Sequence, residues 1–554
     1  MVNVKNLFGM AVMATALVGC SSNDNLAPDG KDNVGKTGEA YASFTINLPT
    51  TRATRVAGEP TFAEGDAKEY EVKNGTILIF TNDGKFVTSA QLGNMNPWKD
   101  IKTDGVTTAA TATVQLTGVE VGGNYQALVL LNNDVDGAPS KVTLPTSGES
   151  YASWNAKAEN ATAAYLNTDY IFMANAPKYT GTSTEPTTLV PVANICASRE
   201  QAEAQPATTV YVERGLAKVT MQKFNDGGYT IAAGTYEGGK VEITAWQLDV
   251  TNKSTFPVHQ TDGLMTAWDQ IWNTGRFFDA TSSMFQRVYW GKDPNYSGGA
   301  LQDLDACKAA FNMITNDKVV GEAGIENPQY CLENTFDLAN MMQGQTTRVV
   351  FKAIFTPKDF VTGQTFYKIG NNTAIWNATN LAQQIKTVAF KAMNITNADE
   401  QAKYSVDLSK GTNISGKAGL HKITADNITF TGKGTSKVTE DVVNAINDKL
   451  GLKETGISTY LNGEAYYIAR IKHFNELTPW NAGQAYGIEN GKYLGRYGVL
   501  RNNWYDLSVN SISGLGYPDV PEVKPNMPDD ENEQFINVEV KILDWAKRSQ
   551  SIDL

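Results

Sequence analysis

The chain has 554 residues, of which 47 are basic and 59 acidic, so its net charge is −12. Hydrophobic residues make up 41% of the sequence, and this length suits two or three domains with large cores. No cluster of Lys or Arg interrupts the acidic balance, which argues against nucleic acid and anionic lipid surfaces as partners. The 48 glycines and 23 tyrosines, with many threonines and valines, favour a protein rich in strands and turns.

The N-terminus has the form of a targeting signal. Lys5 precedes an apolar run at residues 7–18 that is too short to cross a bilayer comfortably. The run ends in Leu-Val-Gly-Cys, which resembles a bacterial lipoprotein signal, where the peptide is cut before the cysteine and the cysteine is acylated. We predict a signal peptide over residues 1–19, lipid on Cys20 and a polar tether over residues 20–40. An ordinary secretory signal is the alternative.

Three further cysteines are present, at Cys196, Cys307 and Cys331. An odd number cannot make a complete disulfide framework, and the spacing fits no zinc pattern. In an oxidising compartment Cys307 could pair with Cys331. Buried free thiols are the alternative.

The first clear strand lies at residues 41–49, where apolar and polar residues alternate with a period of two. Its apolar face consists of Ala42, Phe44, Ile46 and Leu48. Small and polar residues then surround Arg52 and Arg55, which predicts an exposed loop open to a trypsin-like protease. Any surface loop can carry arginines, so this interpretation depends on the position of the loop directly after the first strand.

A second clear strand ends the chain, because apolar residues alternate with polar ones from residue 536 onward. Its apolar positions are Ile536, Val538, Val540 and Ile542, followed by Trp545. Residues 517–533 before it are rich in proline and acids, which predicts a semi-rigid, solvated spacer. A lone strand is unstable in water, so this one must join a sheet. We predict a sheet of another molecule; folding back into its own domain is the alternative.

Between these ends, short apolar runs separated by turn residues predict a mainly β protein with a few helices. In a first domain we expect strands at residues 76–80, 111–116, 125–131, 170–173, 208–212 and 216–222, and a helix at residues 150–166. In a second domain we expect strands at residues 241–250, 347–356, 364–369, 464–471 and 499–512, and helices at residues 377–393 and 439–452.

No residues assemble into a recognisable catalytic or metal-binding motif. His259, His421 and His473 each stand alone, which favours structural or surface roles. Five tryptophans could stack on carbohydrate, although core packing is the stronger interpretation: Trp246, Trp268, Trp272, Trp480 and Trp504. We therefore predict neither an enzyme nor a cofactor or metal site.

Four phrases of the sequence resemble the fimbrillins of the Bacteroidetes, the shaft subunits of type V pili, and are closest to the minor-fimbrium type. They lie at residues 125–133, 210–219, 499–505 and 536–545, and their order along the chain is the strongest part of the resemblance. Residues 255–345 show no such match.

The resemblance implies two tandem transthyretin-like β-sandwiches, here at residues 56–228 and 229–516. It also implies transport as a lipoprotein to the outer membrane, where an arginine-specific protease cuts after Arg52 or Arg55. The first strand, within residues 41–55, then leaves its groove, and the strand within residues 534–554 of a neighbouring copy replaces it. Implied partners are other copies head-to-tail, anchor and tip pilus subunits, the protease, and membrane lipid through Cys20.

A different class of function also fits the sequence. The chain could be a monomeric surface lipoprotein, or a tip subunit, that binds a glycan or a host ligand. A tip subunit needs no detachable donor strand, so the alternating C-terminal strand favours the shaft. A glycoside-processing enzyme has no motif to support it.

Overall fold

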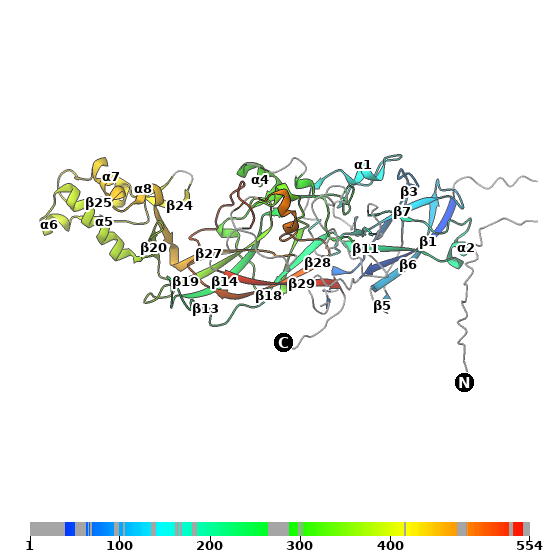
Figure 1. Cartoon of the computed structure of the whole chain (residues 1–554), viewed down its shortest axis with the longest axis horizontal. Coiled ribbons are helices and arrows are strands. Elements are labelled where there is room, and N and C mark those ends of the chain that lie inside the picture. Colours follow the sequence, from blue (N-terminus) through cyan, green and yellow to red (C-terminus); the bar gives the residue numbers. More distant parts are fainter. Residues whose placement is uncertain are drawn as a thin grey trace, which may run out of the picture.

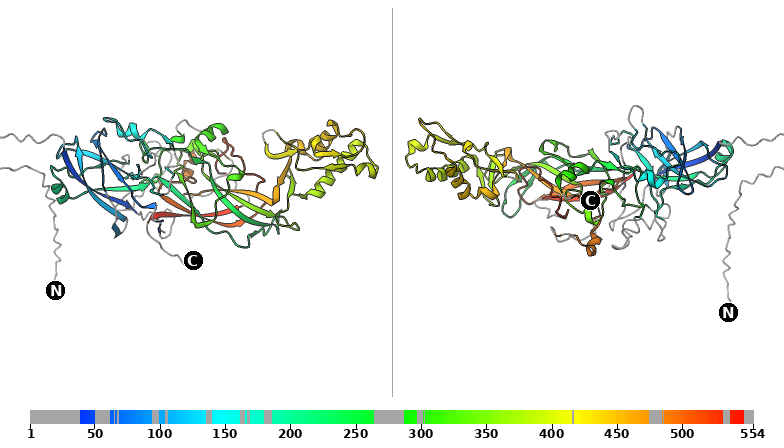
Figure 2. Two further views of the ribbon diagram at one scale, coloured as in Figure 1. Left: turned by 180° about the vertical axis from the view of Figure 1, so that it is seen from behind. Right: turned by 90° about the horizontal axis from the view of Figure 1, so that it is seen from above.

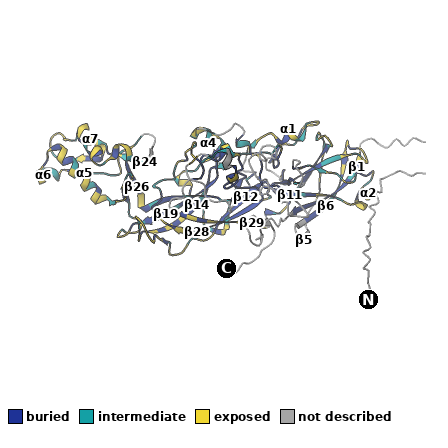
Figure 3. Ribbon diagram, viewed as in Figure 1, coloured by how far each residue is buried: buried dark blue, intermediate teal, exposed yellow. Residues whose placement is uncertain are grey.

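The computed structural model describes residues 39–49, 62–93, 99–134, 140–263, 287–473 and 484–546, with shorter gaps inside these ranges. The described chain forms three units in a row, with the N-terminal strands at one end and helices α5 to α8 at the other (Figure 1). Views from behind and from above show the same elongated order (Figure 2). Buried residues follow the strands through the middle of the molecule (Figure 3). The prediction of a mainly β fold is confirmed.

The first unit is built on one curved sheet with the order β4-β3-β7-β9-β11-β1-β6-β5, and β10 pairs with β7. The sheet curls until β4 meets β6, where the hydroxyls of Thr88 and Thr117 lie 3.2 Å apart. Asp83 and Gly84 lie in the hairpin turn between β3 and β4. The strands are β1 (Glu39–Pro49), β3 (Gly75–Thr81), β4 (Phe86–Gln91), β5 (Lys99–Thr103), β6 (Val106–Thr117), β7 (Tyr125–Leu131), β9 (Met173–Asn175), β10 (Val190–Pro191) and β11 (Thr208–Arg214).

The expected helix at residues 150–166 is wrong in length. α1 (Tyr151–Asn155) ends at Asn155, and β8 (Glu159–Asn160) follows it and pairs with β16 (Ser254–Thr255). Ser150 caps α1, since its side chain accepts a hydrogen bond from the backbone N–H of Ser153. α2 (Arg199–Ala204) is the other α-helix of this unit.

The central unit is a sandwich of two sheets with the orders β18-β12-β28-β29-β2 and β13-β14-β19-β27. Side chains of both sheets share one core, in which Trp246, Phe351 and Tyr505 are fully buried. The strands are β2 (Phe62–Glu64), β12 (Leu216–Met221), β13 (Tyr229–Thr230), β14 (Lys240–Asp249), β18 (Gly324–Leu332), β19 (Arg348–Thr356), β27 (Glu464–Arg470), β28 (Asn503–Ile512) and β29 (Ile536–Ala546). The small pair β15 (Thr251–Asn252) and β17 (Phe311–Asn312) and helix α4 (Leu304–Ala310) lie beside it.

The boundary between these two units differs from the expected one. We placed residues 216–222 in the first domain, but β12 lies in the central sheet, parallel to β28. The chain passes from β11 to β12 through Gly215 alone. A Cβ at Gly215 would lie 2.5 Å from the hydroxyl of Tyr165, so a larger residue would disturb this junction.

A third unit, not expected from the sequence as a separate body, is inserted between β19 and β27. The predicted helices are confirmed as α5 (Ala378–Met393) and α7 (Glu440–Lys449), with α6 (Ala398–Gln401) and α8 (Leu452–Thr455) beside them. Asn377 caps the start of α5, and Asn394 ends it in the left-handed conformation (φ 54°). The strands are β20 (Phe366–Ile369), β21 (Ile375–Asn377), β22 (Tyr404–Val406), β23 (Thr412–Ile414), β24 (Lys417–Lys422), β25 (Ile428–Phe430) and β26 (Ile457–Tyr460).

Buried charges fill the seam between the first two units. Arg214 at the end of β11 donates from Nη1 to Asn502 Oδ1 (3.1 Å) and from Nε to the carbonyl of Glu69 (2.8 Å). The carboxylate of Glu69 accepts an ion pair from Lys218 on β12 (2.7 Å). Burial lowers the pKa of Arg214 to about 10. Because an unpaired charge in such a place is costly, these pairs fix one relative position of the two units.

A second buried group of charges continues the seam. Glu213 accepts from His259 Nδ1 (2.8 Å), and Arg287 lies 3.4 Å from its other oxygen. Arg501 pairs with Glu333 at 2.5 Å, and its carbonyl accepts from Arg287. The seam is therefore made by residues within, or in contact with, the segments 210–219 and 499–505 singled out in the sequence.

The possible disulfide between Cys307 and Cys331 is not formed, and both residues are buried free thiols. They lie in different surroundings: Cys331 belongs to the core of the central sandwich, whereas Cys307 on α4 packs against Gly344. Burial raises the pKa of Cys307 to about 11 and that of Cys331 to about 12. Both thiols therefore stay protonated and unreactive in the folded chain.

We expect Cys307 and Cys331 to resist alkylation in the native protein and to react with iodoacetamide once the chain is unfolded without reductant. Mass spectrometry of tryptic peptides would measure the label at each site. Peptides joined by a Cys307–Cys331 bond would contradict this expectation.

Arg501→Met should destabilise the fold, because it leaves the carboxylate of Glu333 buried without its cation. The expected loss in the free energy of unfolding is about 3–5 kcal/mol, measured by denaturant titration. Lys318→Met is the control, since Lys318 pairs with Asp317 at the exposed surface and should leave the titration unchanged. Equal stability of the two variants would show that the seam does not hold the units.

Candidate functional site

β1 is an interior strand of the first sheet. It runs antiparallel to β6 from Glu39 to Pro49 and parallel to β11 from Phe44 to Asn47. The predicted apolar face of Ala42, Phe44, Ile46 and Leu48 is at most 2% exposed, and Ala40 is buried beside it. Removing β1 would therefore leave backbone groups unpaired along two neighbouring strands and expose a row of apolar pockets.

Polar contacts also fix β1 on its other face. Ser43 Oγ donates to the carbonyl of Ala202 at the end of α2 (2.9 Å) and lies 2.7 Å from the hydroxyl of Thr113. Tyr41 exchanges two backbone hydrogen bonds with Cys196, at 2.8 and 2.9 Å. Contacts of Ser43 and Tyr41 with neighbouring segments thus hold β1 in addition to its buried apolar face.

β29 has the predicted alternation, with Ile536, Val538 and Val540 buried and Asn537, Glu539 and Lys541 exposed. It does not stand apart from its own chain. It pairs antiparallel with β28, with Ile536 opposite Ile512 and Ile542 opposite Tyr505. The expectation that the strand is tethered away from its own domain is corrected: in this structure the tail folds back into the central sheet.

The connection before β29 is also not a solvated spacer in the described part of residues 517–533. Arg348 Nη2 donates to the carbonyl of Pro521 (2.6 Å), and Val523 is buried. Asp529 accepts from Tyr486 and Thr346, both at 3.0 Å, and Asp530 accepts from Arg496 (2.9 Å). The acids of this segment are bound by distant side chains, so it is a packed return segment across the central unit.

A short strand links the two ends of the chain. β2 pairs in parallel with the end of β29, with Phe62 opposite Asp544 and Ala63 opposite Trp545. β2 follows the arginine-bearing segment, residues 50–61, while β1 precedes it in the other sheet. The chain therefore crosses from one sheet to the other through this segment. Arg52 and Arg55 themselves, like Cys20, lie outside the described residues.

The structure shows the surroundings of some of the histidines and tryptophans considered in the sequence. His259 and His473 are buried, and His473 Nδ1 lies 2.8 Å from the hydroxyl of Tyr505, so both have structural roles. Trp246 and Trp504 are core residues whose indole N–H groups donate to Glu322 and Thr220. His421 is half-buried on β24, and Trp268, Trp272 and Trp480 lie outside the described residues.

No group of three or more His, Cys, Asp or Glu residues suited to a metal occurs in the described part of the chain. Within the same residues, no helix is long and apolar enough to span a membrane. The candidate site therefore consists of the buried position of β1 and of a second strand, β29, in which apolar residues alternate in the same way.

Residues 458–551, which contain β27, β28 and β29, match the family described as "Major fimbrial subunit protein type IV, Fimbrillin, C-terminal". A comparison with curated protein sequences finds no match. Among solved structures, a candidate cell adhesion protein from Parabacteroides distasonis is 10% identical, with a TM-score of 0.39, over 92% of this chain and 99% of that one.

Two fimbrial proteins are also similar. A fimbrial assembly protein from Parabacteroides distasonis is 13% identical (TM-score 0.29) over 60% of this chain and 93% of its own. The C-terminally truncated tip fimbrial protein Mfa3 of Porphyromonas gingivalis is 10% identical (TM-score 0.30) over 91% of this chain and 100% of its own. Scores this low carry no functional argument, so the assignment depends on the sequence match. On that match, residues 458–551, which include the last strand, are similar to the C-terminal region of the fimbrillins.

Proposed function

We propose that this chain is a structural subunit of a bacterial surface fimbria that supports adhesion. It is exported as a lipoprotein acylated at Cys20 and polymerises at the outer membrane by donor-strand exchange. An arginine-specific protease triggers the exchange by cutting after Arg52 or Arg55. Its partners are other copies of the chain, head-to-tail, and anchor and tip subunits.

The position of β1 carries this proposal. An interior strand is held in place by the covalent continuity of the chain as well as by its contacts, because the attached segment gives it a high effective concentration at the groove. A cut at Arg52 or Arg55 would remove that advantage and leave β1 bound by its contacts alone. The cut then acts as the switch for strand exchange.

The free energy of strand exchange is the free energy gained when a strand fills the β1 position, less the free energy lost when β29 leaves its own sheet. The apolar side chains contribute similarly to both. Phe44, Ile46 and Leu48 are buried on β1, and Ile536, Val538 and Val540 on β29. Each such side chain contributes roughly 1.5–3 kcal/mol on burial. What differs is the backbone: a vacant β1 position exposes the edges of both β6 and β11. A vacant β29 position exposes the edge of β28 and only the three residues of β2. Filling the first vacancy therefore satisfies more backbone groups.

Because β29 is docked in its own chain, the proposal requires two releases. β1 must leave the groove after the cut, and β29 must separate from β28 before it can enter the groove of another copy. Head-to-tail donation of this kind does not close on itself, so it extends into a filament.

One observation favours the alternative function, a monomeric or tip surface lipoprotein that binds a glycan or host ligand. The tail completes its own sheet and the return segment is packed, so the described chain needs no neighbour for stability. Polymerisation assays decide between the two functions.

Arg52→Ala combined with Arg55→Ala should leave lipidated monomers, because the cut that frees β1 is lost. Cells carrying this variant should show no fibres by electron microscopy and no ladder of multimers on a gel. Thr51→Ala with Thr54→Ala is the matched control in the same segment and should still form fibres. Fibres from the arginine variant would refute the switch.

A reversible bond between β28 and β29 should block polymerisation. Val509 and Val538 are opposite each other in the register, so Val509→Cys with Val538→Cys would join the two strands on oxidation. We expect monomers after oxidation and multimers after reduction of the protease-treated protein, measured by gel filtration. Val538→Cys alone is the control. Multimers that form while the bond is intact would show that β29 is not the donor.

A further inference from the structure

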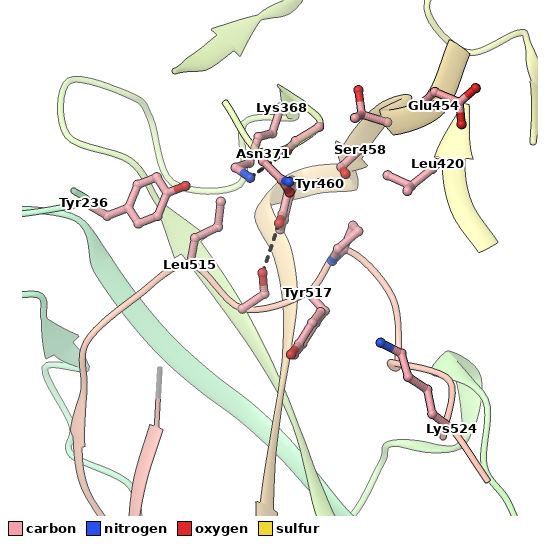
Figure 4. Close-up of a pocket in the computed structure, with 14 residues that line it drawn as sticks. Tyr236, Lys368, Asn371, Leu420, Glu454, Ser458, Tyr460, Leu515, Tyr517 and Lys524 are labelled. Atoms are coloured by element: carbon pink, nitrogen blue, oxygen red, sulfur yellow. Dashed lines mark hydrogen bonds between the residues drawn. The ribbon is translucent and has the colours of Figure 1, made fainter. Parts of the chain in front are cut away.

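A cavity of about 590 Å³ lies where the central unit meets the inserted α/β unit (Figure 4). One wall comes from the inserted unit, with Lys368 on β20 and Ser458 on β26. The central unit contributes Tyr236, and the return segment contributes Tyr517 and Lys524. The volume falls within the roughly 300–1,000 Å³ that is common for sites of small ligands.

The fold holds two aromatic side chains of this cavity and the backbone of a third aromatic residue. Tyr236 packs edge-on against Phe355 with ring centroids 6.2 Å apart. Tyr460 donates its hydroxyl to the carbonyl of Gly516 (2.9 Å). The backbone of Tyr517 exchanges two hydrogen bonds of 2.7 Å with Tyr466. Aromatic rings fixed before a ligand arrives lose little entropy on binding, which suits stacking against a flat apolar face.

Polar groups of both kinds surround these rings. Lys368 Nζ donates to the carbonyl of Gly370 (2.8 Å), which orients its ammonium group at the wall. The backbone N–H of Lys524 donates to Gln343 (3.3 Å), while its side chain is exposed and enters the cavity from the side opposite Tyr236 (Figure 4). Asn371 adds an amide, and Glu454 is the single carboxylate among the lining residues. The lining residues thus include two ammonium groups and one carboxylate, and the nearby carboxylate of Asp519 acts on the lining residue Tyr460.

This combination narrows the class of ligand. Lysines and amides in the walls disfavour a purely apolar lipid chain, because their polar groups would lose water without replacement. The chain carries no basic stripe for a nucleic acid backbone. A sugar has an apolar face for stacking, hydroxyls for Asn371 and Ser458, and, if acidic, an anion for the ammonium group of Lys524.

We propose that this cavity binds a short acidic glycan, such as one that carries a sialic acid, a uronic acid or a sulfate. The rings of Tyr236 and Tyr517 stack on the sugar, and the ammonium group of Lys524 binds its anionic group. This site does not depend on polymerisation, since every wall is present in a single chain.

The test uses the full monomeric chain on a printed array of acidic and neutral glycans. We expect binding to acidic glycans, with at least about a tenfold loss for Lys524→Met, which removes a charge-assisted contact. Lys433→Met is the control, since Lys433 is exposed outside the cavity and its loss should not change binding. The thermal midpoint of each variant establishes that it is folded.

Several results would overturn this inference. Binding to neutral glycans alone would exclude the acidic class, and the absence of any glycan binding would exclude the site. Acidic glycans bound equally well by the wild type, Lys524→Met and Tyr517→Ala would place recognition elsewhere on the chain. None of these outcomes bears on fibre formation, which the cysteine and arginine variants test separately.

Discussion

Everything in the first unit depends on the pairing of one interior strand. β1 joins β11 on one side and β6 on the other, so without it the sheet separates into two parts with unpaired edges. Backbone groups at such edges are costly when they are buried. The same residues that make the unit stable as a single chain make it incomplete once that strand leaves. The proposed strand exchange depends on this property, because the vacated position would then accept a strand of the same alternation.

The buried charges of the seam confine the effect of losing β1 to the first unit. Arg214 and Lys218 flank the Gly215 junction and are bound by Asn502 and Glu69, so the central unit is anchored to β11 rather than to β1. Loss of β1 therefore need not separate the units. Because each charge requires its own partner, the seam also excludes other relative positions of the two units.

The sequence predicted the features that have a local cause. Period-two alternation located β1 and β29 and their buried faces, and the amphipathic pattern located α5 and α7. The return segment was misread because prolines and acids usually indicate solvent, whereas Asp529 and Asp530 are bound by Thr346, Tyr486 and Arg496, far along the chain. The cavity escaped notice for the same reason, since its walls come from separate segments. Contacts between residues that are far apart in the chain leave no periodic pattern in the sequence.

The pairing of β29 with β28 also determines which grooves β29 could enter in the proposed strand exchange. A strand that is free in solution would bind any open groove, including wrong ones, and an exposed edge strand favours aggregation. A strand that is already paired enters a groove only where the new site satisfies more backbone than the old one. β29 has β28 as its one long neighbour, whereas the position of β1 has β6 along its whole length and β11 over part of it. Under the proposed strand exchange, the pairing of β29 with β28 would lower the driving force for assembly and would restrict assembly to subunits whose β1 has left.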